Sequence, residues 1–204
     1  MKKIKFLAML PLIFLYINTS SAQQLRLSII GAVSKETGFH SEQFNWGFSA
    51  GGNIFFYLSN NFMLGIRSAY SRWTPDESEF TETLNNLIDG TITGNATVIE
   101  VVPSIRLTTN YSMSNINLFL QAGAGAFIFN NRVIISGTSD GATVNDTSGR
   151  KNRTRFGFDA GLGLSFGNLQ NISVDIYPLF NFVFLGENNY LRYLTFNIAI
   201  GIGI

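Results

Sequence analysis

Apolar and polar residues alternate with a period of two along most of this chain. In residues 194–204 every even position is Leu, Ile or Phe, and every odd position is Thr, Asn, Ala or Gly. Successive side chains of a β-strand point to opposite faces, so the pattern predicts a strand. The sequence ends on this apolar segment, and we therefore expect the strand to be paired and its outer face to be shielded from water.

The same alternation predicts eight strands. They cover residues 24–34, 44–58, 62–73, 96–107, 116–129, 155–166, 172–184 and 194–204. Long connections (35–43, 74–95, 130–154, 185–193) take turns with short ones (59–61, 108–115, 167–171). An even strand count with long loops at one end and short turns at the other is typical of a transmembrane β-barrel. We expect some hairpins to extend above the membrane, and a bulge or local kink at Pro103 and at Pro178.

Charged residues within these strands fall on one parity, with Arg72 near a strand end as the exception. The expected interior set is Arg26, Arg67, Glu100, Arg106, Arg155, Asp159 and Asp175. The opposite parity is almost wholly apolar. A soluble lipocalin-like barrel keeps its apolar side chains inside and must show a charged surface to water, but these strands carry few charges. With the apolar face outward, a barrel in water would expose a patch larger than a monomer tolerates. The sequence therefore predicts an all-β, eight-stranded, antiparallel, up-and-down barrel with lipid outside and charges inside.

The inward charges are expected in two tiers. With odd strands rising toward the long loops, Arg67, Glu100 and Asp159 lie near or above mid-height and Arg155 lies higher still. Low in the barrel we expect Arg26, Arg106 and Asp175. Buried charges persist when they are paired and hydrogen-bonded, so we predict salt bridges across a narrow lumen, with Arg67–Glu100 as the adjacent-strand pair. An eight-stranded barrel is narrow enough for its side chains to plug it.

The first 22 residues have the layout of a cleaved signal peptide. Lys2, Lys3 and Lys5 precede an apolar run from Phe6 to Ile17, and small residues follow up to Ala22. We therefore expect a signal peptide at 1–22 and one barrel domain at 23–204.

The net charge changes sign when the signal peptide is removed. The chain has 14 Lys+Arg and 13 Asp+Glu; removing three lysines leaves 11 against 13, a net charge of −2. A general affinity for nucleic acid loses its support, and the absence of cysteine excludes a disulfide framework.

Aromatic residues are expected to form two girdles at the membrane interfaces. At the loop ends lie Trp46, Tyr70, Trp73, Phe156, Phe184 and Tyr193; at the turn ends lie Tyr57, Phe62, Tyr111 and Phe166. The alternative interpretation is that aromatic residues simply favour strands.

Candidate chemistry is sparse. His40, the only histidine, stands beside Ser41 and Glu42, but neighbours in one loop cannot easily form a catalytic triad. The acidic residues of 74–95 match no calcium-loop spacing. Arg150, Lys151 and Arg153 could contact lipopolysaccharide phosphates, or could be ordinary solvated charges. We predict no catalytic residue, cofactor or metal site.

The signal ending at Ala22, the strand pattern, the segments 121–125 (QAGAG) and 159–163 (DAGLG), and the terminal strand together resemble the small outer-membrane β-barrel superfamily that includes OmpA-type and OmpX-type barrels. The resemblance implies a place in the bacterial outer membrane and insertion by the barrel assembly machinery. That machinery usually meets a C-terminal aromatic residue, where this chain has Ile204.

Three functions remain open at this point. The first is a non-enzymatic, monomeric, integral outer-membrane barrel that is structural or that binds partners through its extracellular loops, beside membrane lipids and lipopolysaccharide. The second is a narrow pore for small solutes. The third is an outer-membrane lipid hydrolase, which only His40 and its neighbours suggest.

Overall fold

A computed structural model describes residues 25–37, 43–85, 87–109, 116–139, 142–168, 171–186 and 189–204. The predicted signal peptide, His40 and Tyr111 lie outside these ranges. The elements are β1 Leu25–Glu36, β2 Gly47–Ser59, β3 Phe62–Trp73, η2 Glu77–Phe80, α2 Thr81–Asn85, β4 Ile88–Thr108, β5 Ile116–Ser139, β6 Ala142–Gly167, β7 Ile172–Gly186 and β8 Asn189–Gly203. Among the described residues no helix is long and apolar enough to cross a membrane.

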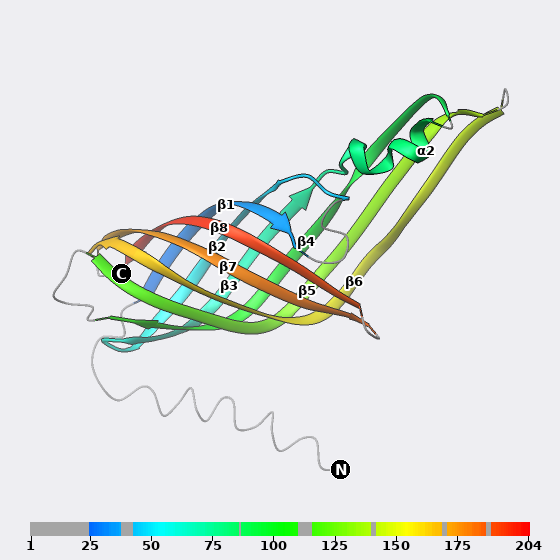
Figure 1. The fold of residues 1–204 in the computed structure, drawn as a ribbon. Helices are drawn as coiled ribbons and strands as arrows, with labels where there is room; N and C mark the ends of the chain where they lie inside the picture. Colours follow the sequence, from blue (N-terminus) through cyan, green and yellow to red (C-terminus); the bar gives the residue numbers. More distant parts are fainter. Residues whose placement is uncertain are drawn as a thin grey trace, which may run out of the picture.

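The eight strands form one closed antiparallel barrel in chain order (Figure 1). The seam between the first and last strands runs from the pair Arg26–Gly203 to the pair Glu36–Tyr193. Beyond it, Leu25 and Ile204 exchange two backbone hydrogen bonds of 2.9 and 2.7 Å. The predicted fold class is therefore confirmed, and the apolar last strand has neighbours on both edges. We call the end where β1 begins and β8 ends the turn end, and the opposite end the loop end.

The two faces of the strands divide as the alternation predicts. Every second residue of β3 from Met63 to Trp73 is buried in the interior, and the residues between them are exposed. On the outer surface large aliphatic side chains are uncovered: Ile29 is 78% exposed and Leu162 is 59% exposed. Apolar residues thus cover the outside of the barrel, and polar, charged and some aromatic residues fill the inside.

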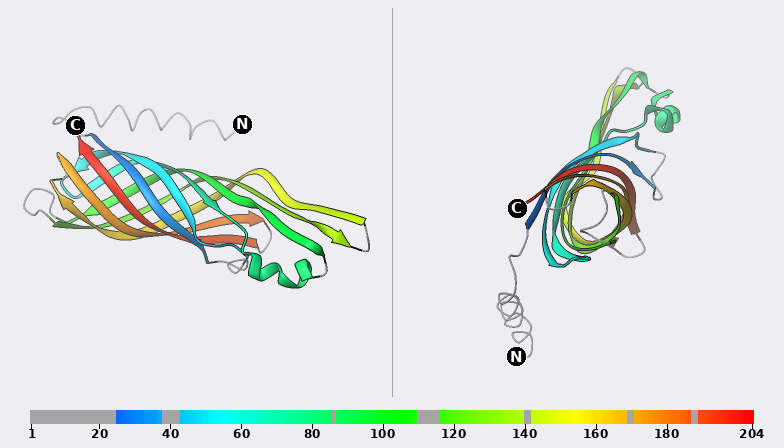
Figure 2. Two further views of the ribbon diagram at one scale, coloured as in Figure 1. Left: turned by 90° about the horizontal axis from the view of Figure 1, so that it is seen from above. Right: turned by 90° about the vertical axis from the view of Figure 1, so that its left-hand side faces the viewer.

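Strands β4, β5 and β6 are much longer than the sequence predicts. They continue past the barrel rim as a three-stranded sheet, which we call the projecting sheet (residues 88–95, 131–139 and 142–153) (Figure 2). The expectation that some hairpins extend beyond the barrel is confirmed, but the predicted bounds are wrong: the described residues of 130–154 are strand, and so is 88–95 of the predicted loop 74–95. The predicted loop 185–193 is also mostly strand, because β7 ends at Gly186 and β8 begins at Asn189. Weak alternation among polar residues marks these extensions, since no lipid selects an apolar face there.

Neither proline shifts the strand register, so the predicted bulges are absent. The β3–β4 ladder pairs Ile66 with Pro103 without interruption, and the β7–β8 ladder pairs Pro178 with Phe196. On the other side of each proline, two pairs are missing from the β4–β5 and β6–β7 ladders, and the same register resumes afterwards. A proline has no N–H to donate, so the ladder opens on one side only.

An apolar cluster fills the loop end of the interior. It includes Trp73, Phe127, Val183 and Leu191, with Phe44 packed against them from the segment before β2. Two residues of the predicted girdles are therefore misplaced, because Trp73 and Tyr193 point inward and are almost fully buried. Others face outward as expected: Trp46, Tyr70, Phe156, Phe184 and Phe166 are exposed.

Candidate functional site in the barrel interior

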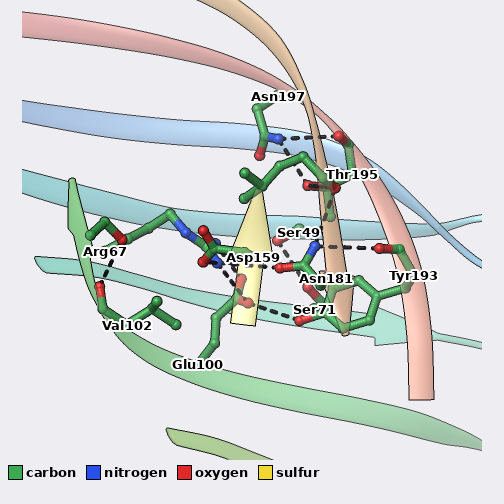
Figure 3. Close-up of polar contacts among 12 residues, drawn as sticks. Ser49, Arg67, Ser71, Glu100, Val102, Asp159, Asn181, Tyr193, Thr195 and Asn197 are labelled. Atoms are coloured by element: carbon green, nitrogen blue, oxygen red, sulfur yellow. Dashed lines mark hydrogen bonds and ion pairs between the residues drawn. The ribbon is translucent and has the colours of Figure 1, made fainter. Parts of the chain in front are cut away.

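The upper ion-pair group consists of Arg67, Glu100 and Asp159 at mid-barrel (Figure 3). Arg67 Nη1 donates to Glu100 Oε1 at 2.6 Å, and its Nη2 donates to Asp159 Oδ2 at 2.7 Å. Tyr193 donates its hydroxyl to Glu100 Oε2 at 2.8 Å. All three charged side chains are at most 2% exposed. Such charge-assisted bonds in a water-poor interior are short and strong.

The strand register brings this group together. Glu100 pairs with Ala69 on the neighbouring strand β3, two residues from Arg67, so both side chains point inward at nearly the same level. Asp159 comes from β6, on the other side of the lumen, and lies directly beside Asn181 of β7. Arg67 therefore spans the barrel, and its Nη2 also donates to Asn181 Oδ1 at 3.3 Å.

The lower ion-pair group, near the turn end, consists of Arg26, Arg106 and Asp175. Arg26 Nη2 donates to Asp175 Oδ1 at 2.8 Å, and Arg106 Nη1 donates to Asp175 Oδ2 at 2.6 Å. Ser165 also donates to Asp175 Oδ1, at 2.6 Å. One carboxylate thus accepts from two guanidinium groups and a hydroxyl.

Further interior groups hold the two lower arginines. Gln121 accepts from Arg106 Nη2 at 2.9 Å, and the Arg106 guanidinium lies 4.0 Å from the centre of the Phe119 ring. Ser173 accepts from Arg26 Nη2 at 2.6 Å. A side chain at Gly201 would begin 2.5 Å from the Arg26 guanidinium, so this glycine leaves the space that Arg26 occupies. A glycine inside a strand is often found at such a close approach of a neighbouring group.

The two groups carry opposite formal charges. One arginine and two carboxylates give the upper group −1, whereas two arginines and one carboxylate give the lower group +1. Their sum is zero. The two groups together are therefore neutral, and their charges are polarised along the barrel.

Six of the seven charges expected inside form these ion pairs, including Arg67–Glu100. Arg155 does not: it is half-buried beside Phe127, and among the described residues it has no ion pair. It stands too close to the loop end, where the lumen is lined by the apolar cluster.

The candidate lipopolysaccharide contacts lie on β6, in the projecting sheet. Arg150 pairs with Asn131 and Arg153 pairs with Phe129 of β5. Lys151 lies between them, and Arg153 is exposed to solvent.

Several partners in the site were not predicted as members of it. Tyr193 was assigned to a girdle, and Asn181, Gln121 and Ser173 were not among the predicted interior residues. The signal was available, because each lies on the inward parity of its strand. Strict parity counting would have placed Tyr193 inside.

The acidic segment after β3 lies outside the barrel. Asp76 caps η2: its carboxylate accepts from Ser78 Oγ at 2.7 Å and from the Ser78 backbone N–H at 3.1 Å. These two hydrogen bonds lower the pKa of Asp76 below its usual 3.8. Among the described residues no group of three or more Asp, Glu or His side chains could hold a metal ion.

Comparison with known proteins adds evidence at the level of the fold. No protein-family model matches the chain, and no curated protein matches it. The structure is similar to the outer membrane protein OprG from Pseudomonas aeruginosa, with a TM-score of 0.55, 8% identity, and coverage of 90% of this chain and 96% of that one. It is also similar to a major outer membrane protein from Thermus thermophilus, with a TM-score of 0.53, 10% identity, and coverage of 90% and 100%. The chain therefore has the fold of the small bacterial outer-membrane β-barrels.

Proposed function

We propose that this protein is an integral, non-enzymatic barrel of the outer membrane whose interior is closed to solutes. The apolar outer surface supports the membrane location, because side chains such as Ile29 and Leu162 would be costly in water and favourable in lipid. The non-enzymatic role is supported by the ion pairs that hold six of the inward charged side chains. His40, the residue that suggested a lipid hydrolase, lies outside the described residues.

The observation that carries the closed interior is the pair of ion-pair groups that cross the lumen. Arg67 joins β3 to β6, and Arg106 joins β4 to β7 through Asp175. The side chains concerned are 0 to 2% exposed. Bulky residues occupy other levels of the interior, among them Tyr177, Phe55 and Trp73. A passing ion would have to displace paired charges that are expensive to separate.

Electrical recording tests the closed interior. Purified protein is inserted into planar bilayers, with a channel-forming porin as the positive control in the same membranes. We expect no sustained conductance from this protein. A steady, large conductance would instead establish the alternative function, a pore.

The projecting sheet is the part of the molecule that we propose for contact with partners outside the cell. Residues 142–153 of β6 pair with β5 on one edge, and no described strand pairs with the other edge. Arg150, Lys151 and Arg153 lie on this stretch, and phosphate groups of lipopolysaccharide are the partner chemistry that suits them.

A shortened variant tests this proposal. Replacing residues 130–152 by Asn-Gly joins the paired residues Phe129 and Arg153 through a two-residue hairpin turn and removes Arg150 and Lys151. Arg153→Gln in the same variant removes the third cation. We expect unchanged mobility of the folded barrel on unheated gels, but weaker binding to the surface of lipopolysaccharide vesicles. Equal binding by the shortened and complete proteins would remove the projecting sheet from partner binding.

A further inference from the structure

The outer surface of the barrel is hollowed over strands β8, β1, β2 and β3. A groove of about 1080 Å³ lies there, and its floor includes Gly31, Gly52 and Ser68. Isoleucines border it, among them Ile198 and Ile200 of β8. Small residues cause the depression: Gly31 pairs with Ala50, and Gly52 pairs with Ser68, so four adjacent outward positions lack large side chains.

The three charged residues on the outer surface of the barrel lie just beyond this groove. When the projecting sheet is left aside, the outward positions of the eight described strands carry only Lys35, Arg72 and Arg192 as charged residues. All three are basic and all are near the loop end. They belong to β1, β3 and β8, three of the four strands that form the groove. Below the projecting sheet, the outward positions of the described parts of β4 to β7 carry no charge.

Two of these cations are free for a ligand. Arg72 and Arg192 are exposed, and among the described residues neither has an ion-pair partner. Lys35 donates one proton to the Phe44 carbonyl at 2.5 Å and keeps two more. An arginine facing lipid at the membrane midplane would cost roughly 2–4 kcal/mol, so side chains of this kind belong at the level of the headgroups.

The spacing suits a lipid. Arg72 lies four residues beyond Ser68 on β3, and Lys35 lies four residues beyond Gly31 on β1, or about 13 Å along each strand. One leaflet of the hydrocarbon core is about 15 Å thick. A chain that starts at phosphate level therefore reaches the groove. Arg192 and Arg72 are separated by three strand spacings, about 14 Å, across the sheet. Arg72 is in register with Phe196, so Arg192 also lies four residues, about 13 Å, further along β8. The two guanidinium groups are therefore too far apart for one phosphate.

We propose that this surface binds one glycolipid of the lipopolysaccharide type, with an acyl chain in the groove and separate phosphates at Arg72 and Arg192. The inference rests on the proposed membrane location and adds a specific lipid site to it. A phospholipid with a single phosphate, such as phosphatidylglycerol, would leave one of the two guanidinium groups unused. Exposed aromatic residues flank the headgroup level: Trp46 lies 6.5 Å from Phe196, and Phe48 lies 6.4 Å from Tyr70, between ring centres. The site is distinct from Arg150, Lys151 and Arg153 on the projecting sheet.

Two variants test the two parts of the site. Gly31→Leu fills the groove, and no atom lies within 4 Å of the new Cβ, so folding should be unaffected. The double variant Arg72→Gln and Arg192→Gln removes the phosphate contacts. Ala160→Leu is the matched control, because it enlarges an outward residue of β6, away from the groove. Mobility of each folded barrel on unheated gels verifies its membrane-inserted form.

The measurement is the number of lipids retained per barrel, by native mass spectrometry after mild delipidation of nanodiscs that contain either lipopolysaccharide or phosphatidylglycerol. The complete protein and Ala160→Leu should retain one lipopolysaccharide, and phosphatidylglycerol should be lost. Retention should fall about tenfold in Gly31→Leu and in the double glutamine variant.

Three results would overturn the site: full retention by Gly31→Leu, full retention by the double variant, or equal retention of phosphatidylglycerol. A protein that failed to enter nanodiscs would contradict the membrane location itself, which separates the two failures. The triple variant Arg150→Gln, Lys151→Gln and Arg153→Gln should keep its lipopolysaccharide in this assay; loss there would place the lipid on the projecting sheet.

Discussion

The upper ion-pair group gathers two carboxylates around one guanidinium group, and the lower group gathers two guanidinium groups around one carboxylate. A carboxylate that loses its partner can take up a proton and become neutral. A guanidinium group stays charged at any pH that a protein meets. The two groups therefore differ in how they respond to the loss of their central residue, although their geometries are similar.

The neutral side chains around the two ion-pair groups also differ. In the lower group, Arg106 lies over the Phe119 ring and contacts Gln121, and Arg26 contacts Ser173. The upper group has the Tyr193 hydroxyl as a further donor. The lower group thus has two neutral acceptors and a ring face for its two cations, against one neutral acceptor, Asn181, for the single cation of the upper group. Each group also has one hydroxyl donor for a carboxylate, Ser165 in the lower group and Tyr193 in the upper.

The largest effect is expected from Asp175→Asn. It removes the carboxylate shared by Arg26 and Arg106 and leaves two buried positive charges. Breaking a buried pair in this way costs about 3–5 kcal/mol of unfolding free energy. Urea unfolding in detergent micelles, followed by tryptophan fluorescence, would measure it at pH 7 and pH 4. Asp89→Asn, at an exposed site, is the control; an equal loss in both variants would contradict the central role of Asp175.

Arg67→Met should come next, with a loss of about 3 kcal/mol at pH 7, because Glu100 and Asp159 then face each other without a cation. Acid should reduce this loss, since either carboxylate can become neutral, whereas the deficit of Asp175→Asn should persist. The same unfolding experiment at the two pH values makes the comparison. A deficit that grows at pH 4 would show that the two groups do not differ as described.

Tyr193→Phe should have a smaller effect. It keeps the ring, which packs edge-on to Trp73 at 5.2 Å between centres, and removes only the hydroxyl that donates to Glu100. Loss of a hydrogen bond to a charged group costs about 1.5–3 kcal/mol. The exposed Tyr190→Phe provides the reference, and equal stability of the two variants would show that the hydroxyl adds nothing.

The smallest effect concerns Asp76, an exposed carboxylate that serves as a baseline for the buried ones. Its pKa is lowered by the hydrogen bonds from Ser78, so its contribution to η2 is present above pH 3.8 and is lost as the pH falls through the lower folded-state pKa. An NMR titration of the carboxyl group should give a midpoint below 3.8. In Ser78→Ala the midpoint should move upward, and a midpoint that stays in place would contradict the assigned cause.

Parity along the strands was the strongest information in the sequence. The alternation in 194–204 and 62–73 predicts which side chains face inward, because a strand buried on one face tolerates no register slip. It therefore also places Arg26, Arg67 and Glu100 inside. Lengths were harder: 130–154 was assigned to a loop because polar residues above the membrane lack the apolar contrast that marks a strand.

The alternation of inward and outward positions did not predict where all the aromatic residues lie, or which charges pair across the lumen. Trp73 and Tyr193 suit an interface girdle by chemistry, but the closed lumen needs large side chains to fill it. The pairing of Arg67 with Asp159 depends on how the eight strands are staggered around the barrel, which a single sequence does not state. The prediction that Arg155 joins the interior charges is wrong for the same reason, because its height was judged by counting residues along one strand.

The position of Asp175 late in the chain sets an order on assembly. Its partners Arg106 and Arg26 precede it by 69 and 149 residues. While the barrel is incomplete, both guanidinium groups lack their carboxylate and are best kept hydrated. Contacts between residues so distant in sequence form late and slowly. Docking of β7 thus supplies the carboxylate that both guanidinium groups lack, and barrel closure completes the lower ion-pair group.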